Sequence, residues 1–196
     1  MSKLLIYIEH LGVSLRVGLY VSIFFSYLKK GFSLQSLTLL IKIRIFSLVE
    51  KQKLIQTCSD YLKEKINSLN AIINEVSESS NAESKSSAGD KHETSKAMMQ
   101  LEIEKLGTQL KEAEGQLAEF EKINFNKNFQ SIEQGALVET NKGCFLIASS
   151  IGKITVDDKT VFVISSKSPL ALKLMGSKEK DTVIFNNVSY LINSVL

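Results

Sequence analysis

The stretch Met99–Phe120, with the sequence MQLEIEKLGTQLKEAEGQLAEF, decides the fold of this chain. Apolar residues recur in it at spacings of 4, 3, 4, 3, 4 and 3, which is a strict heptad pattern. This spacing predicts a helix with all of these side chains on one face. The residues of this seam are Met99, Ile103, Leu106, Leu110, Ala113, Leu117 and Phe120.

A second apolar seam precedes it, on a predicted helix of about 28 residues that starts near Glu50. Ser77–Asp90 breaks the period with Ser, Asn, Ala and Gly, so we predict a tip loop over residues 77–93. Two matched seams joined by a short loop favour an antiparallel coiled-coil hairpin over residues 49–125, about 40 Å long. A helical bundle and a dimeric zipper are the alternatives. The residues of the second seam are Ile55, Cys58, Leu62, Ile66, Leu69, Ile73 and Val76.

The period shortens towards two in residues 126–196, which predicts a small β-rich domain with one short helix. We expect three β-hairpins, with turns at Asn141-Lys142-Gly143, Asp157-Asp158-Lys159 and Asn186-Asn187. Ser168 as N-cap, Pro169 at the first helical position and Gly176 as the stop predict the helix between them. The fold class is therefore α+β, with a helical hairpin followed by a β-rich domain.

Charge is distributed unevenly along the chain. Residues 1–48 carry six Lys or Arg and one acid, a local charge of +5 within a total of +3, which leaves −2 for residues 49–196. Binding to duplex DNA by counterion release needs clustered cations. We therefore expect no direct sequence-specific DNA binding by the patterned part of the chain.

Residues 1–48 are apolar and basic, without a regular period. The run Val17–Leu28 is shorter than the ~20 residues of a membrane span, and Tyr27-Leu28-Lys29-Lys30 does not resemble a signal-peptide cleavage site. Three interpretations remain: an interfacial membrane anchor, an extra packing segment, or translated sequence upstream of the actual start. We expect a cytoplasmic location and no association with a membrane.

Cysteine and histidine give no sign of a metal centre or a nucleophile. Cys58 and Cys144 lie far apart, and His10 and His92 add no metal-ligand spacing. We expect both cysteines to be small buried apolar residues in a reducing compartment.

One group of residues is placed for chemistry, namely Gly89-Asp90-Lys91-His92-Glu93, where the loop gives way to the second helix. Asp90 and Glu93 are three residues apart, so both carboxylates lie on the same side of a starting helix. The same spacing is typical of a capping box. From spacing alone, simple capping is favoured over a functional pair.

Two motifs in this order resemble those of the Gre transcript-cleavage factors. Gly89-Asp90-Lys91-His92-Glu93 is similar to the Gly-Asp-x-x-Glu motif of the family's hairpin tip. Ser168-Pro169, Leu174-Met175-Gly176 and Asp181 are similar to the family's C-terminal Ser-Pro…Leu-x-Gly…Gly-Asp signature, with Lys180 in place of the usual Gly. The resemblance covers about residues 50–196 and implies an FKBP-like fold for residues 126–196. Family members begin near the position of Lys51, so we favour the upstream-start interpretation of residues 1–48.

The resemblance implies a transcription elongation factor that binds RNA polymerase and acts from the hairpin tip, in its secondary channel. Asp90 and Glu93 would share a Mg²⁺ ion with the polymerase, which would then cleave backtracked RNA. The chain would activate the polymerase in trans rather than be an enzyme itself, and it would meet the nascent RNA 3′ end only indirectly. Ser168, Pro169, Gly176 and Asp181 would belong to the domain that docks on the polymerase, in mainly structural roles.

The tip departs from the usual Asp-Leu-Ser-Glu-Asn of the family, since it reads Asp90-Lys91-His92-Glu93-Thr94. The run 88–102 resembles a smaller Gre-related subgroup. Polymerase binding therefore carries over more firmly than cleavage does. The first alternative is a polymerase-binding regulator that uses the same hairpin without cleavage, and the second is an FKBP-like prolyl isomerase.

Overall fold

The computed structural model describes the backbone of residues 34–83 and 90–196, and the side chains of residues 49–79 and 94–196. Its contacts divide the chain into two compact units, Met1–Val49 and Glu50–Leu196. The second unit is α+β: two long helices are followed by a six-stranded mixed sheet with one short helix. None of the helices in the described residues is long and apolar enough to cross a membrane.

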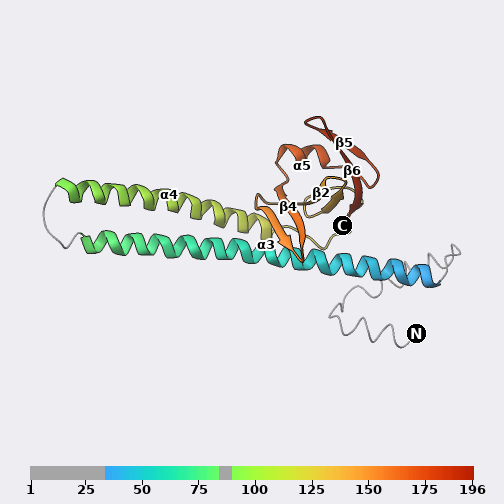
Figure 1. The fold of residues 1–196 in the computed structure, drawn as a ribbon, viewed down its shortest axis with the longest axis horizontal. Coiled ribbons are helices and arrows are strands. Elements are labelled where there is room, and N and C mark those ends of the chain that lie inside the picture. Colours follow the sequence, from blue (N-terminus) through green and yellow to red (C-terminus); the bar gives the residue numbers. More distant parts are fainter. Residues whose placement is uncertain (1–33, 84–89) are drawn as a thin grey trace, which may run out of the picture. The chain divides into compact units, whose positions relative to one another are not determined.

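The two long helices are α3 (Leu34–Glu83) and α4 (Asp90–Glu121), which lie side by side in Figure 1. The described residues of both seams are buried or half-buried, as the spacing predicts. Near the sheet, Leu62 of α3 and Phe120 of α4 belong to one apolar cluster, and farther along α3 Leu69 clusters with Leu106 of α4. Because early α3 residues pack with late α4 residues, the helices run antiparallel.

The ends of α3 correct the predicted boundaries. The helix begins at Leu34 rather than near Glu50, and it continues to Glu83, so Ser77–Glu83 is not part of a loop. At the other end of the predicted loop, residues 90–93 are the first turn of α4. The apolar period ends at Val76, but no Gly or Pro follows before Gly89, and polar residues cost a helix only tenths of a kcal/mol each. An apolar seam therefore marks where a helix packs, not where it ends.

The sheet has the strand order β3-β4-β2-β1-β6-β5. β2 and β4 are parallel, and every other neighbouring pair is antiparallel. The three predicted hairpins are confirmed, and the turns Asp157-Asp158 and Asn186-Asn187 have positive φ at both residues, as type I′ turns require. The strands are β1 (Leu137–Thr140), β2 (Gly143–Ala148), β3 (Gly152–Val156), β4 (Lys159–Ser165), β5 (Thr182–Phe185) and β6 (Val188–Val195).

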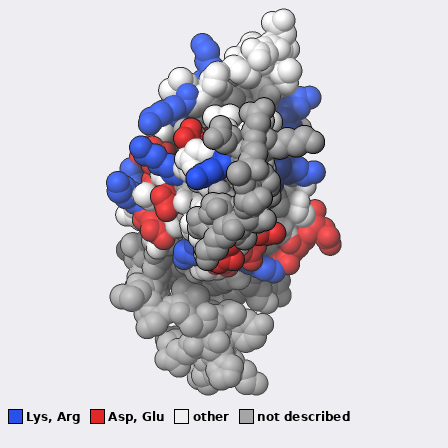
Figure 2. Space-filling model, turned by 90° about the vertical axis from the view of Figure 1, so that its left-hand side faces the viewer, with Lys and Arg blue, Asp and Glu red and all other residues white. Residues whose placement is uncertain are grey.

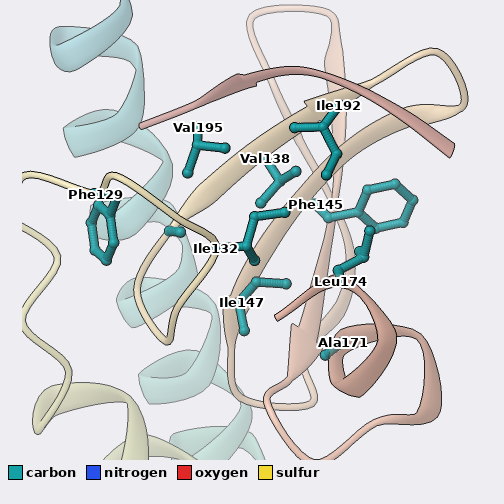
Figure 3. Packing of buried hydrophobic residues seen from close by; sticks show 10 residues of the cluster. Phe129, Ile132, Val138, Phe145, Ile147, Ala171, Leu174, Ile192 and Val195 are labelled. Carbon is teal, nitrogen blue, oxygen red and sulfur yellow. The ribbon is translucent and has the colours of Figure 1, made fainter. Parts of the chain in front are cut away.

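Each face of the sheet packs against a different helical element, because side chains alternate along a strand. On β2, Phe145 and Ile147 join the cluster of the short helix α5 (Pro169–Leu174), in which Ala171 and Leu174 are fully buried. Figure 3 shows this cluster between the sheet and α5. On the opposite face, Leu146 and Ala148 join the bases of α3 and α4.

Polar contacts also join the base of α3 to the sheet. The Nζ atom of Lys159 lies 2.9 Å from Glu50, and that of Lys53 lies 2.5 Å from Asp157. The hydrogen bond to Glu50 is the main cause of the raised pKa of Lys159. Lys51 is buried, and its Nζ donates to the backbone oxygen of Leu196 at 2.7 Å and lies 4.4 Å from the ring centre of Phe129. The helix pair and the sheet thus share one core and one set of contacts.

Candidate functional site

The candidate site lies at the end of the helix pair that is remote from the sheet. α4 begins at Asp90, thirty residues before the buried Phe120 at its base, which is about 45 Å along a helix. The side chains of Asp90, Lys91, His92 and Glu93 lie outside the described residues, so the predicted carboxylate pair is defined by backbone position alone.

The backbone at Asp90 provides a defined electrostatic setting. Asp90 and Glu93 both fall in the first turn of α4, and residues three apart on a helix are neighbours on its surface. The first turn of a helix also has free N–H groups and the positive end of the helix dipole, which stabilises carboxylates in their charged form. Because α4 begins at Asp90, this residue lies inside the first turn rather than at the N-cap of the predicted capping box, and both carboxylates suit the positive end of the helix dipole.

Two carboxylates can supply only part of a magnesium site. Mg²⁺ takes six oxygen ligands and keeps several waters, usually with one or two carboxylates and substrate phosphates. Among the residues whose side chains are described, no group of three or more His, Cys, Asp and Glu is arranged to hold a metal ion. With only two carboxylates at the start of α4, most ligands of a magnesium ion would have to come from water and other groups.

A groove lies between the two helices near this end of the pair. It has a volume of about 420 Å³ and is lined by residues from both helices. The heptad pattern does not indicate this groove, because Met98 and Glu102 lie outside the seam. The one available signal was a large apolar residue off the heptad positions, and Met98 is 65% exposed. The lining residues are Glu75, Val76 and Ser79 of α3 with Met98, Met99 and Glu102 of α4.

The four predicted signature residues lie in α5 and in the segments that flank it. The Ser168 Oγ accepts a hydrogen bond from the Ala171 N–H at 3.3 Å, and Pro169 is the first residue of the helix, as predicted. Gly176 has φ +83° and ends the helical segment. The Asp181 Oδ2 accepts from the Lys178 N–H at 2.7 Å, which closes the next turn. Each of the four thus has a role in local structure.

Lys180 has φ +73°, a left-handed conformation that glycine adopts without strain. Its backbone N–H donates to the Ile192 oxygen at 2.8 Å, which ties this turn to β6. This is the position at which the chain departs from the Gly-Asp of the signature. The backbone geometry therefore gives a physical reason for a glycine preference there.

The cysteines are not placed for thiolate chemistry. Cys58 is fully buried, and burial raises the pKa of its thiol to about 12. Cys144 is half-buried, and burial, followed by the charge of Glu139, raises the pKa of its thiol as well. A reactive cysteine needs a lowered pKa, so both thiols are neutral, packing groups at physiological pH.

Charges of both signs are interspersed on the described surface in the view of Figure 2. Residues 49–125 carry ten Lys against fourteen acids, a local charge of −4, whereas residues 126–196 carry eight Lys against six acids, a local charge of +2. The helix pair is therefore the acidic part of the molecule, which does not favour binding to a phosphate backbone.

No protein-family model matches the chain. A search of curated proteins likewise finds no match.

Proposed function

We propose that the chain is a polymerase-binding transcription factor of the Gre type. In this proposal the helix pair is an antiparallel coiled-coil hairpin, and the sheet with α5 is an FKBP-like domain that docks on RNA polymerase. The hairpin tip would enter the secondary channel of the polymerase, in the cytoplasm. The observation that carries the proposal is the start of α4 at Asp90, which puts a carboxylate pair at the end of the helix pair remote from the sheet.

The length of the helix pair supports a function in which the tip reaches into another protein, rather than catalysis by this chain alone. From the buried Leu62 to the end of α3 at Glu83 the helix extends 21 residues, or about 30 Å, beyond the core that it shares with the sheet. An element of this length can carry two carboxylates into a narrow channel while the sheet stays outside. The chain would thus supply ligands to the active centre of another protein.

The chemistry assigned to the tip is the positioning of a cation. Asp90 and Glu93 would bind Mg²⁺ together with polymerase groups and RNA phosphate. When bound, Mg²⁺ can lower the pKa of an attacking water and stabilise the leaving oxygen of a phosphodiester. Asp90 and Glu93 would bind the ion, and the first turn of α4 would position these two residues.

A regulator that occupies the channel without stimulating cleavage is the second candidate function. The observation in its favour is Lys91-His92 between the two carboxylates, which puts basic groups where the Gre family usually has an apolar residue and a serine. The prolyl isomerase alternative is not favoured by the packing of α5, since Ala171 and Leu174 fill the space against the sheet.

A transcript-cleavage assay on a stalled complex tests the proposal. Purified full-length protein is added to a backtracked elongation complex in Mg²⁺ buffer, and shortened RNA is measured over time, with binding to polymerase measured in parallel. The proposal expects both binding and faster cleavage. Binding without cleavage favours the channel-occupying regulator, and absence of binding contradicts both candidates.

A further inference from the structure

The groove between α3 and α4 combines apolar walls with an acidic rim. Val76 and Met99 are the half-buried ends of the two seams, and Met98 beside them is 65% exposed. Met99 lies nine residues after Asp90, or about 13 Å along α4. The groove is thus on the shaft, separate from the carboxylate pair at the tip.

Methionine suits such a groove because its side chain is flexible and polarizable. Methionine-lined surfaces adapt to partners of different shapes and are common at binding surfaces. Covering an exposed methionine stabilises a complex because apolar surface is removed from water. Most of the surface of Met98 is exposed, so this stabilisation is available to a partner.

Charge around the groove identifies the kind of partner. Residues 72–79 and 94–105 carry Glu75, Glu78, Glu102 and Glu104 against Lys96 and Lys105, a local charge of −2. Lys105 lies 3.5 Å from Glu102, whereas Glu75 and Glu78 form no ion pair with any described residue. Complementary charge therefore comes from a cationic partner, and RNA phosphates are repelled.

We propose that this groove binds a polypeptide segment of RNA polymerase that presents an apolar side chain next to Lys or Arg. The inference rests on the proposed function and deepens it, since it names a contact on the shaft that is independent of the tip carboxylates. Met98 and Met99 would contact the apolar side chain, and Glu75 and Glu102 would face the cationic group. The groove would hold the shaft at a fixed depth in the polymerase.

Matched substitutions in the full-length chain test the groove. The affinity of each variant for purified core polymerase is measured. Met98→Gln removes the exposed apolar wall, and its control is Leu101→Gln, because Leu101 is 61% exposed on the same helix but does not line the groove. Glu75→Lys reverses a rim charge, and its control is Glu64→Lys, an exposed position on α3 outside the groove. All four positions are exposed, so the fold is expected to be retained.

The expected result is binding weakened by about three- to tenfold for Met98→Gln and for Glu75→Lys. The loss for Glu75→Lys should shrink at high salt, and both controls should stay within about twofold of the unsubstituted chain. A photo-crosslinking residue in place of Met98 should label a polymerase peptide that contains Lys or Arg.

Three outcomes overturn the inference, and they are distinguishable. If the unsubstituted chain binds polymerase while the groove variants bind as their controls do, the groove contact is wrong and the proposed function stands. If the unsubstituted chain does not bind polymerase, the proposed function fails and the groove contact fails with it. Crosslinking of the Met98 position to RNA alone also contradicts the groove contact.

Discussion

The two halves of the helix pair differ in what buries them. In the half next to the sheet, Cys58, Leu62 and Phe120 are almost inaccessible, because β2, β3 and β4 cover them. In the remote half, the two helices alone bury Leu69, Leu106 and Ala113, whereas nearer the tip Ile73, Val76 and Met99 are only half-buried and Met98 is exposed. Both halves carry the same apolar spacing, so the difference comes from the sheet and not from the seam.

This difference predicts that the two parts of the helix pair contribute differently to the stability of the fold. Where the sheet packs on the two helices, side chains of the seam are enclosed by α3, α4 and the sheet. Where the two helices pack alone, the flanks of the seam stay open to water. The half next to the sheet should therefore contribute most of the stability of the unit Glu50–Leu196. The remote half has apolar and acidic surface free for a partner. Substitutions along the pair should show a corresponding gradient.

The largest expected effect is that of Leu62→Ala. Leu62 is fully buried between the helices and the sheet, so the substitution removes its transfer energy and leaves a cavity. We expect a loss of about 2–5 kcal/mol in the free energy of unfolding. Urea unfolding of the full-length chain measures it, and a loss below about 1 kcal/mol would contradict a shared core at the base.

Thiol labelling should distinguish the two cysteines by about a hundredfold in rate at pH 8. Cys58 is inaccessible and its pKa is about 12, so it reacts only when the base of the helix pair opens, whereas Cys144 is half-buried. A disulfide reagent followed by peptide mapping measures both rates. Equal rates would show that Cys58 is as accessible to the reagent as Cys144, and would contradict a closed core at the base of the helix pair.

The pH dependence of stability follows from the raised pKa of Cys58. The pKa of the thiol rises from 9.0 to about 12 on folding, so the folded state favours the neutral thiol. The contribution of Cys58 to the free energy of unfolding is therefore fully present below pH 9 and is lost as the pH rises towards 12. Cys58→Val removes the titrating group at similar volume. The stability difference between the original chain and the variant should shift only above pH 9.

A smaller loss is expected for Leu110→Ala, in the part of the helix pair that packs without the sheet. Leu110 is half-buried in the cluster around Leu69, Leu106 and Ala113. Since only part of its surface is removed from water, we expect a loss of about 1–2 kcal/mol, less than for Leu62→Ala. The same urea titration measures it. An unchanged free energy of unfolding would contradict packing between the two seams.

The smallest effect has the opposite sign. Lys180→Gly should stabilise the chain by about 0.5–1 kcal/mol, because glycine adopts φ +73° without strain and this gain exceeds its greater flexibility in the unfolded chain. Thermal unfolding measures it, with Lys178→Gly as a control in the same exposed segment. Destabilisation by Lys180→Gly would show that the lysine side chain itself holds the turn.

Local rules explain which parts of the fold could be predicted from the sequence. The three hairpins and α5 were predicted because their turns and caps depend on adjacent residues, such as Asn186-Asn187 and Ser168-Pro169. The seam of each long helix was predicted because its period persists for several turns. The ends of α3 were not, since helix continuation through Ser77–Glu83 needs no apolar signal.

Properties that depend on distant contacts could not be predicted. The burial of Lys51 depends on Phe129 and Leu196, far away in the sequence, and no local pattern indicates it. The groove at Met98 likewise arises only when α3 and α4 lie side by side. Of the candidate site, the motif was expected where the loop gives way to the second helix, and the structure includes Asp90 and Glu93 in the first turn of α4 rather than in a loop over 77–93; their role in cation binding stays a prediction.

Comparison of Asp90→Asn with the unsubstituted chain tests the central proposal most directly. Asp90 is the first residue of α4, where replacing the carboxylate by an amide weakens only its interaction with the helix dipole, by about 0.3–1 kcal/mol, whereas an amide is a much poorer ligand than a carboxylate for Mg²⁺. RNA cleavage in a backtracked elongation complex is measured at several Mg²⁺ concentrations, with polymerase binding as the internal control. The proposal predicts a steep loss of stimulated cleavage, partial rescue by higher Mg²⁺ and unchanged binding, with the same outcome for Glu93→Gln. Cleavage that is stimulated equally by Asp90→Asn, Glu93→Gln and the unsubstituted chain would contradict it.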